Sequence, residues 1–431
     1  MARRIMSLPR LWSSRVFSVE LDGRSAPLYF AIQEKHRGEE VPRVFRNLQT
    51  HERCYSLFVC SSDRIQRAKF YGELRDKLLK GLPPECDFKP MFSFLPNVKD
   101  SLIKGYFVKD TSECSIPTER VFSDLMQSDP VLVCSYSRGE DGRLWTQQLW
   151  SCAESQRMEM SEEYYVVPIE APGYHPSTLN IINSDVFYSF EEAYEVLQKQ
   201  SDKVSVLQCG DIIPESKAVL ELVSQRPEAR HKPDFPVIVI EGLDATGKTT
   251  LTESLRETLG AALLRSPPQC LSPWRARFDQ EPPLIRRAFY ALGNYITAEQ
   301  IGQEAMQTTV IVDRYWHSTA AYAIATAVSG PVCNLPSEGS EVYCWPGDLL
   351  QPSLVVLLTL DPEERRRRLR GRGQGTTEEE QELDHNQLFR LKVEGAYRRI
   401  SGPACVTVDA SPSADQVLQQ VLLLIRGKCH L

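Results

Sequence analysis

From residue 236 onward, short apolar runs alternate with longer stretches in which apolar residues recur at helical spacing. The apolar runs predict strands at residues 237–240, 309–312, 354–360 and 406–408. The helical spacing predicts helices at residues 249–259, 284–305, 316–328, 362–371, 384–400 and 413–426. Continuous apolar strands separated by helices are typical of a parallel sheet buried on both faces, so this half predicts a three-layer α/β domain.

The preceding part of the chain has a less regular pattern. Strands are predicted at residues 55–59, 130–135 and 144–150, and helices at residues 64–82, 190–199 and 217–223. The sequence RGEDG at residues 138–142 predicts a turn, so the last two strands are expected to form a hairpin. This half is predicted to be a separate α+β domain, and its sequence does not indicate a role.

Residues 224–236 (SQRPEARHKPDFP) hold three prolines, mixed charges and little apolar content. This composition is typical of an exposed linker between domains. The predicted organisation is an N-terminal domain at residues 20–223, a linker at residues 224–235 and a second domain at residues 236–431.

Composition and charge exclude several classes of protein. The chain has 431 residues, with 50 Lys and Arg against 57 Asp and Glu, which gives a net charge of −7. An acidic chain argues against sequence-independent nucleic-acid binding, because that binding depends on basic side chains that neutralise phosphates. The longest apolar runs, such as residues 354–360, fall far short of the roughly 20 residues that span a bilayer. The 12 cysteines include no C-x-x-C pair, which favours reduced thiols over a zinc cluster or a disulfide framework.

The first 19 residues differ in composition from the rest of the chain. Residues 1–19 contain four arginines and four serines, and no acidic residue precedes Glu20. This composition predicts a mitochondrial transit peptide and a location in the mitochondrial matrix, although Pro9 interrupts the amphipathic helix that such peptides form. The alternative interpretation is a disordered basic tail.

The strongest local motif is G-x-x-x-x-G-K-T, which lies between a predicted strand and a predicted helix. Its residues are Gly242, Leu243, Asp244, Ala245, Thr246, Gly247, Lys248 and Thr249. Glycines let successive backbone N–H groups point at phosphate oxygens, and the helix N-terminus adds a positive end. Lys248 supplies a positive charge to the β- and γ-phosphates, and the Thr249 hydroxyl is expected to ligate Mg²⁺. The motif predicts a nucleotide-binding P-loop.

Three segments together resemble the thymidylate kinase family of nucleoside monophosphate kinases. They are residues 241–250 (EGLDATGKTT), residues 312–318 (VDRYWHS) and the arginine-rich residues 365–372. The resemblance covers residues 235–431, and within the family it points to the mitochondrial UMP-CMP kinase branch, whose members carry a large N-terminal extension. It implies a P-loop NTPase fold, ATP and Mg²⁺ as cosubstrate and cofactor, and a possible homodimer.

Roles for three charged residues follow from this resemblance. Asp313 and Arg314 come directly after a predicted strand, at the edge where α/β sheets bind ligands. A carboxylate there can organise Mg²⁺, and the family's matching arginine clamps the acceptor phosphate bidentately. Asp244, inside the P-loop, is implied to hydrogen-bond the acceptor sugar. The alternative for Asp313 and Arg314 is a surface ion pair at a strand end.

The arginine-rich segment is interpreted as a lid. Arg365, Arg368 and Arg372 recur at i, i+3 and i+7, so they share one helical face. An arginine on a closing lid can neutralise charge on the transferred phosphoryl group. Some family members carry an arginine in the P-loop after the acid, where this chain has Ala245, so Arg368 or Arg372 is expected to be catalytic. The alternative is a solvated basic helix.

Acceptor recognition is expected from the helix that follows a loop at residues 266–283. Tyr290 can stack on a base, although an aromatic side chain at helical spacing is more often part of the core. Thymidylate kinases typically carry an arginine at the position matching Asn294. An asparagine both donates and accepts, so it can face uracil or cytosine. Further candidates for phosphate contacts are Arg275, Arg286 and Arg287.

These observations predict Mg²⁺-dependent transfer of the ATP γ-phosphoryl group to a pyrimidine nucleoside monophosphate such as CMP, UMP, dCMP or dUMP. A phosphate monoester is largely ionised at pH 7, so the reaction needs no general base. The alternatives are a dTMP kinase, a deoxynucleoside kinase, and a nucleotide-binding regulatory protein that acts through its N-terminal half. His317, Trp345 and the loop at residues 330–346 have no assigned role.

Overall fold

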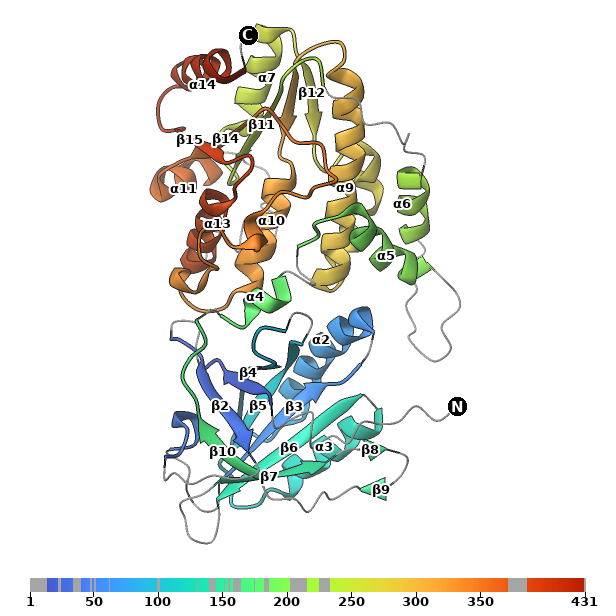
Figure 1. The fold of residues 1–431 in the computed structure, drawn as a ribbon, viewed down its shortest axis with the longest axis vertical. Helices are drawn as coiled ribbons and strands as arrows, with labels where there is room; N and C mark the ends of the chain where they lie inside the picture. The colour runs from blue at the N-terminus through green and yellow to red at the C-terminus, as the bar shows by residue number, and fades with distance from the viewer. Residues whose placement is uncertain are drawn as a thin grey trace. The chain divides into compact units, whose positions relative to one another are not determined.

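The computed structural model describes residues 14–21, 25–33, 40–46, 49, 52–61, 63–98, 101–128, 130–138, 145–150, 152–153, 156–157, 164–173, 175–181, 186–201, 215–224, 233–370 and 386–429. The chain divides into two compact units (Figure 1). Unit 1 comprises Met1–Asn183 and Val328–Asn334, and unit 2 comprises Ser184–Ala327 and Leu335–Leu431.

Unit 1 is built around eight antiparallel strands that close into a barrel. The order around the barrel is β1-β2-β10-β7-β6-β3-β5-β4, and β1 pairs with both β2 and β4. The strands are β1 (Val16–Val19), β2 (Leu28–Gln33), β3 (Arg53–Val59), β4 (Cys86–Phe94), β5 (Ile103–Asp110), β6 (Val131–Arg138), β7 (Trp145–Trp150) and β10 (Tyr164–Pro168). The other described elements are η1 (Arg43–Phe45), α2 (Arg64–Gly81), α3 (Ile116–Ser128), α4 (Ser177–Asn180), η4 (Val332–Asn334) and the short pair β8 (Cys152–Ala153) and β9 (Gln156–Arg157).

Both faces of β3 are buried, which explains why its sequence is largely apolar without clear alternation. Successive side chains of a strand point to opposite faces. In β3, Phe58 packs in the barrel interior with Phe17 and Phe30. The neighbouring Leu57 instead packs in the cluster that holds Phe122 of α3. The barrel therefore has one core inside and a second core beneath its helices.

The predicted α+β class of this half is confirmed. The predicted hairpin is the antiparallel pair β6 and β7, in which Arg138 lies opposite Trp145. Most of the turn predicted between them lies outside the described residues. A further finding concerns the segment predicted to be a transit peptide: its last four residues form β1, and the Arg15 side chain is buried, with Nε donating to Ser93 Oγ at 2.8 Å.

Unit 2 contains a parallel sheet with the order β12-β13-β11-β14-β15. The strands are β11 (Val237–Gly242), β12 (Ala262–Arg265), β13 (Val310–Asp313), β14 (Leu354–Thr359) and β15 (Cys405–Asp409). Four of them match the predicted strands, and the predicted P-loop α/β architecture is confirmed. The pattern missed β12, because this edge strand has only four residues, is partly exposed and ends in an arginine.

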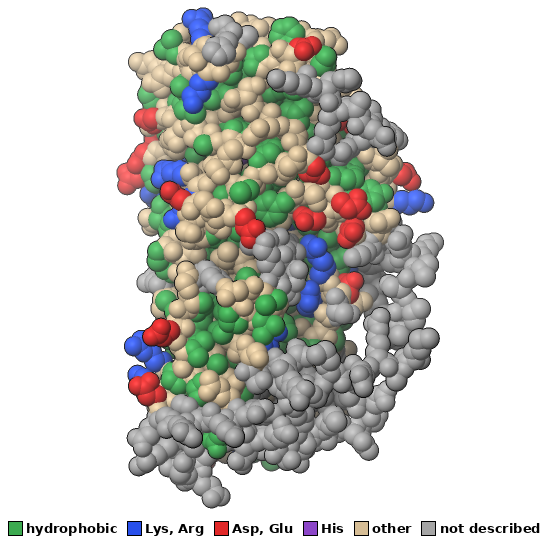
Figure 2. Space-filling model, viewed as in Figure 1, with side chains coloured by type: hydrophobic (Ala, Val, Ile, Leu, Met, Phe, Trp, Pro, Cys, Tyr) green, Lys and Arg blue, Asp and Glu red, His purple; other side chains and the backbone are tan. Residues whose placement is uncertain are grey.

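Some helices of unit 2 pack on its sheet, and others pack on those helices (Figure 1). The helices are α5 (Phe190–Ser201), α6 (Glu215–Ser224), α7 (Lys248–Leu259), α8 (Ser272–Asp279), α9 (Pro283–Glu304), α10 (Trp316–Ala327), α11 (Pro362–Arg370), α13 (Gln387–Arg399) and α14 (Ala414–Cys429). Leu255 of α7 and Val421 of α14 pack in one core cluster with Ile240 of β11. Within the described part of the chain, no helix is both long and apolar enough to cross a membrane. On the face drawn in Figure 2, the acidic and basic side chains of described residues are interspersed.

The division between the units lies earlier in the chain than the predicted linker at residues 224–235. Helix α5 packs on α9, with the rings of Phe190 and Tyr295 5.4 Å apart. The backbone N–H of Phe190 also donates to Asp348 Oδ2 at 2.7 Å. These contacts place α5 in unit 2 rather than in the predicted N-terminal domain. The segment Val328–Asn334 belongs to unit 1, where Ser329 Oγ donates to Glu20 Oε1.

Candidate active site

The P-loop motif forms the connection between β11 and α7. Gly242 and Gly247 have φ angles of 143° and 89°, which lie in the left-handed region that favours glycine. A Cβ atom on Gly242 would lie 2.6 Å from the Leu358 carbonyl oxygen, so the loop needs glycine there. Ala245 also has a positive φ of 64°. The loop thus reaches the N-terminus of α7 through a tight turn, as anion binding at a helix N-terminus requires.

Lys248 is buried at the first position of α7. Its Nζ donates to the Leu243 carbonyl oxygen at 2.8 Å and lies 3.5 Å from Asp244 Oδ1. Burial and the nearby Arg314 guanidinium lower the pKa of Lys248 to about 8. The ammonium group is thus held against the loop, in an environment that disfavours its charge until an anion compensates for the burial.

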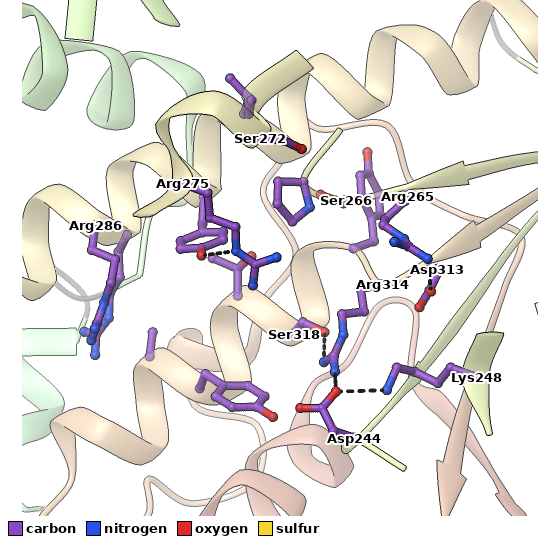
Figure 3. Close-up of a pocket in the computed structure, with 18 of the residues that line it drawn as sticks. Asp244, Lys248, Arg265, Ser266, Ser272, Arg275, Arg286, Asp313, Arg314 and Ser318 are labelled. Atoms are coloured by element: carbon purple, nitrogen blue, oxygen red, sulfur yellow. Dashed lines mark hydrogen bonds and ion pairs between the residues drawn. The ribbon is translucent and has the colours of Figure 1, made fainter. Parts of the chain in front are cut away.

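Asp244 and Arg314 form an ion pair between Asp244 Oδ1 and Arg314 Nη2 (Figure 3). Burial acts to raise the pKa of Asp244, but Arg314 and Lys248 outweigh this effect and hold that pKa below its usual value. The pKa of Arg314 is raised well above its usual value despite burial, chiefly by Asp244. Arg314 Nη1 also donates to Ser318 Oγ at 3.4 Å. This ion pair joins the P-loop to the segment that follows β13.

Glu241, the residue before the loop's first glycine, is fully buried and accepts four hydrogen bonds. Its Oε1 accepts from the backbone N–H groups of Tyr315 (2.8 Å) and Ser318 (3.2 Å). Its Oε2 accepts from Ser318 Oγ and from the Tyr397 hydroxyl, the latter at 3.1 Å. Burial raises the pKa of Glu241, and the Ser318 hydrogen bond opposes that shift. Sequence reasoning assigned no positioning role to Glu241, although a carboxylate ending a buried apolar strand requires such donors.

Asp313, at the end of β13, has one oxygen in an ion pair and one without a partner. Asp313 Oδ2 lies 3.4 Å from Arg265 Nη2, while the buried Oδ1 has no hydrogen-bond partner among the described residues. Thr249 is exposed and lines the same cavity as Asp313. These two groups fit Mg²⁺, which is usually held by one or two protein oxygens together with substrate phosphates. The described residues contain no group of three or more His, Cys, Asp or Glu side chains that could hold a metal without a substrate.

The charged residues open onto a cavity of about 440 Å³. Figure 3 shows Lys248 and Arg286 at opposite ends of the group of lining residues. The lining residues are Asp244, Lys248, Thr249, Arg265, Ser266, Pro267, Gln269, Leu271, Ser272, Arg275, Arg286, Arg287, Tyr290, Asp313, Arg314, Tyr315, Ser318, Thr319, Tyr322, Ala323, Thr326 and Phe389. Five of these residues are arginines, which suits an anionic ligand.

The segment expected to be a loop at residues 266–283 contains η3 (Gln269–Leu271) and α8, and α8 is tied to Tyr290. The Tyr290 hydroxyl donates to Asp279 Oδ1 at 2.7 Å and accepts from Arg275 Nε at 3.1 Å. The Arg275 guanidinium also lies 5.9 Å from the centre of the Tyr290 ring. Tyr290 therefore lines the cavity, and α8 fixes its position. Sequence reasoning missed α8 because its short, polar sequence has little helical periodicity.

Asn294 has a different position from the one predicted. Its side chain is 1% exposed and is not part of the cavity lining among the described residues. Asn294 Oδ1 accepts from Ser266 Oγ at 2.7 Å, and Asn294 Nδ2 donates to Thr319 Oγ1 at 3.0 Å. Both of these partner residues line the cavity. The amide thus lies directly behind two hydroxyl groups.

The predicted lid is only partly described. Arg372 and residues 371–385 lie outside the described residues. Arg368 Nε donates to Glu364 at 2.9 Å, and Arg368 Nη2 donates to the Ala410 carbonyl oxygen at 3.1 Å. Arg368 therefore contacts the segment after β15 and does not line the cavity among the described residues. Arg365, on the same helical face, is buried.

His317 and Trp345, which have no assigned role, are packed together. The centres of their rings lie 5.3 Å apart, and Trp345 Nε1 donates to the Leu349 carbonyl oxygen at 3.0 Å. Burial lowers the pKa of His317 to about 4. These contacts make the pair part of the packing of unit 2.

Comparisons with known proteins show which proteins the chain is similar to. The family described as "Thymidylate kinase" matches residues 240–421. The human protein "UMP-CMP kinase 2, mitochondrial" is 42% identical over 398 residues, which cover 90% of this chain and 86% of the human protein. A thymidylate kinase from Arabidopsis thaliana is 28% identical over 215 residues, covering 46% of this chain and 74% of its own. The solved thymidylate kinase from Candida albicans, with 23% identity and a TM-score of 0.34, covers 45% of this chain and 92% of its own.

Proposed function

The chain belongs to the thymidylate kinase family of nucleoside monophosphate kinases, and we propose that it phosphorylates the pyrimidine monophosphates CMP, UMP, dCMP and dUMP with ATP. The observation that carries the proposal is the linked group of Lys248, Asp244 and Arg314 at one end of an arginine-lined cavity. The name of the 42% identical human relative supports the choice of UMP and CMP as acceptors. Supply of pyrimidine nucleotides in mitochondria would follow from this activity.

Each half of the reaction has its own residues in this proposal. The P-loop N–H groups and Lys248 bind the ATP phosphates, and Arg314 clamps the phosphate of the acceptor. The ion pair between Arg314 and Asp244 orients the guanidinium before substrate binds, so less rotational freedom is lost on binding. The acceptor phosphate is already ionised at pH 7, so catalysis consists of positioning and charge neutralisation. A lid arginine, Arg368 or Arg372, would supply the last positive charge.

Mg²⁺ would be held by the Thr249 hydroxyl and Asp313. When bound, the ion would neutralise negative charge on the substrate phosphates. The Oδ1 of Asp313, which is buried and has no hydrogen-bond partner among the residues that the structure describes, supports this assignment.

Two alternatives are weighed against the same residues. A deoxynucleoside kinase needs a carboxylate base near the acceptor hydroxyl, yet Glu241 is enclosed by four donors and Asp244 is paired with Arg314. A dTMP kinase is favoured by the family description, and the choice between it and a UMP-CMP kinase depends on the acceptor base.

A mitochondrial location is proposed from two observations. The human relative is named as mitochondrial, and residues 1–19 have the composition of a transit peptide. Because β1 belongs to the barrel, we place the removed segment before Arg15 and propose the matrix as the destination.

The test is ADP production by the purified full-length chain with Mg-ATP and one candidate acceptor at a time. Turnover is expected with CMP, UMP, dCMP and dUMP. Lys248→Ala and Arg314→Ala should each reduce kcat/KM by at least about 100-fold, since each removes a charged contact to a reacting phosphate group. A preference for dTMP would mean that the enzyme is a dTMP kinase instead. Turnover of deoxycytidine would mean that it is a deoxynucleoside kinase. No ADP production with any acceptor would contradict both the acceptor assignment and the kinase reaction.

A further inference from the structure

Asn294 can act on a ligand in the cavity only through its two hydroxyl partners. Its side chain is buried behind Ser266 and Thr319, which both line the cavity. Ser266 lies between the two ends of the cavity drawn in Figure 3, and its hydroxyl carries no charge. The pair therefore suits a neutral polar group of the ligand, whereas the arginines suit its phosphate.

The amide fixes which hydroxyl donates and which accepts. A hydroxyl group has one proton and two lone pairs. Ser266 donates its proton to Asn294 Oδ1, so its lone pairs remain for the cavity. Thr319 accepts from Asn294 Nδ2, so its proton remains for another acceptor. In this arrangement Ser266 offers the ligand an acceptor, and Thr319 offers it a donor.

Rotation of the Asn294 amide by 180° reverses both roles. The amide oxygen and nitrogen exchange positions and have nearly the same shape, so the surrounding side chains need not repack. Ser266 then accepts from the amide and offers its proton, while Thr319 donates to the amide and offers its lone pairs. Because one amide holds both hydroxyls, their roles switch together.

The two patterns match the two pyrimidine bases. Uracil has a donor at N3 and an acceptor at O4, whereas cytosine has an acceptor at N3 and a donor at N4. We propose that Asn294 is a positioning residue whose rotation lets Ser266 and Thr319 complement either base, an inference that rests on the proposed function. Tyr290 lies one helical turn before Asn294, so the ring that would stack on the base and the amide that holds the two hydroxyls share one face of α9.

A double-mutant cycle tests whether Asn294 acts through Ser266. The variants are Asn294→Leu, which keeps the side-chain volume, Ser266→Ala, and the two combined, with kcat/KM measured for both CMP and UMP. Each single change should lower kcat/KM by roughly three- to tenfold for both bases, the effect of losing a neutral hydrogen bond. The double variant should lose less than the product of the two single losses, because part of the effect of Asn294 passes through the Ser266 hydroxyl, which both changes affect. Losses that multiply would show that Asn294 acts independently of Ser266. A Ser266→Ala variant within twofold of wild type would show that Ser266 does not contact the base. Either result would overturn the proposal.

Thr319→Val provides a second test that leaves Asn294 in place. It should lower kcat/KM for CMP and UMP by similar factors, within about threefold of each other, and leave KM for ATP within twofold of wild type. A loss of kcat/KM for only one base would overturn the proposed rotation, because an amide that does not rotate would let Thr319 bind that base alone. Wild-type turnover of neither CMP nor UMP would instead contradict the proposed function. Turnover of only one of them would leave the kinase assignment intact and reject the rotation.

Discussion

At the scale of single residues, the lowered pKa of Lys248 makes nucleotide binding depend on protonation. The pKa of Lys248 falls from 10.5 to about 8 because burial and Arg314 disfavour the ammonium group. Between these two values the unfolded chain binds more protons than the folded one, so this residue makes the free energy of unfolding rise with pH across that window. Below about pH 8 the buried charge is a cost to folding, which a bound phosphate would offset.

Binding of ATP is therefore expected to take up a proton above pH 8. At pH 9 Lys248 is mostly neutral in the free protein, and the phosphates of ATP should restore its charge. Isothermal titration calorimetry in two buffers of different ionisation enthalpy should give an uptake of most of one proton. Lys248→Arg is the matched control, since arginine stays protonated and should show no uptake. Equal uptake by both proteins would assign the proton to another group.

At the same scale, sequence reasoning identified residue types well and contacts poorly. The glycines and Lys248 of the P-loop follow from a local pattern, because the loop's backbone angles and charge depend on neighbouring residues. Asn294 was recognised as a residue able both to donate and to accept. Its partners Ser266 and Thr319 lie 28 and 25 residues away, so no local pattern could pair them.

At the scale of elements, Glu241 holds β11 and α10 in register. Its Oε1 accepts from the N–H groups of Tyr315, directly before α10, and of Ser318, in the first turn of α10, where backbone N–H groups need acceptors from outside the helix. Arg314 lies directly before these residues, with a φ of 67° that is uncommon for a side chain of its size. The buried carboxylate thus compensates for the tight turn that aims Arg314 at the cavity.

Two replacements of Glu241 should distinguish the effect of its charge from the effect of its hydrogen bonds. Glu241→Gln keeps an acceptor for the two N–H groups, and both hydroxyl partners can accept from its amide, so stability should fall by less than about 1 kcal/mol. Glu241→Leu leaves those groups unsatisfied and should cost about 2–4 kcal/mol in the free energy of unfolding, with at least a tenfold loss of kcat/KM for the acceptor. Urea denaturation and acceptor kinetics measure the two effects. A Leu variant as stable and active as the Gln variant would rule out the positioning role.

Elements also differed in how well the pattern predicted them. The three central strands of unit 2, β13, β11 and β14, are buried on both faces, so their apolar runs stand out clearly. The edge strand β12 and the polar α8 lack such runs, yet both contribute residues to the cavity. Half-buried elements beside a ligand site carry weaker hydrophobic signals, because part of their surface faces the ligand.

At the scale of the whole molecule, the sequence pattern could not predict that the barrel of unit 1 closes. Closure depends on β1 pairing with β4, in which Phe17 lies opposite Ser93. A pairing between such distant strands is set by the tertiary fold rather than by local propensity. The composition of residues 1–19 predicts that this whole segment is a removable transit peptide. The structure narrows that interpretation, since its last residues belong to the core.

Two truncations test where the removable segment ends. A chain starting at Ser14 keeps β1 and should retain the stability of unit 1. A chain starting at Glu20 loses Arg15 and β1, which removes Phe17 and Val19 from the core and leaves β2 and β4 without a shared neighbour. Loss of one large core side chain alone costs about 3–5 kcal/mol, so the shorter chain should show protease cleavage within unit 1 at concentrations that spare the longer one. Mass spectrometry of the protein imported into mitochondria should find its N-terminus before Arg15. An N-terminus at Glu20 with unit 1 resistant to protease would mean that β1 is dispensable and that the barrel is stable without it.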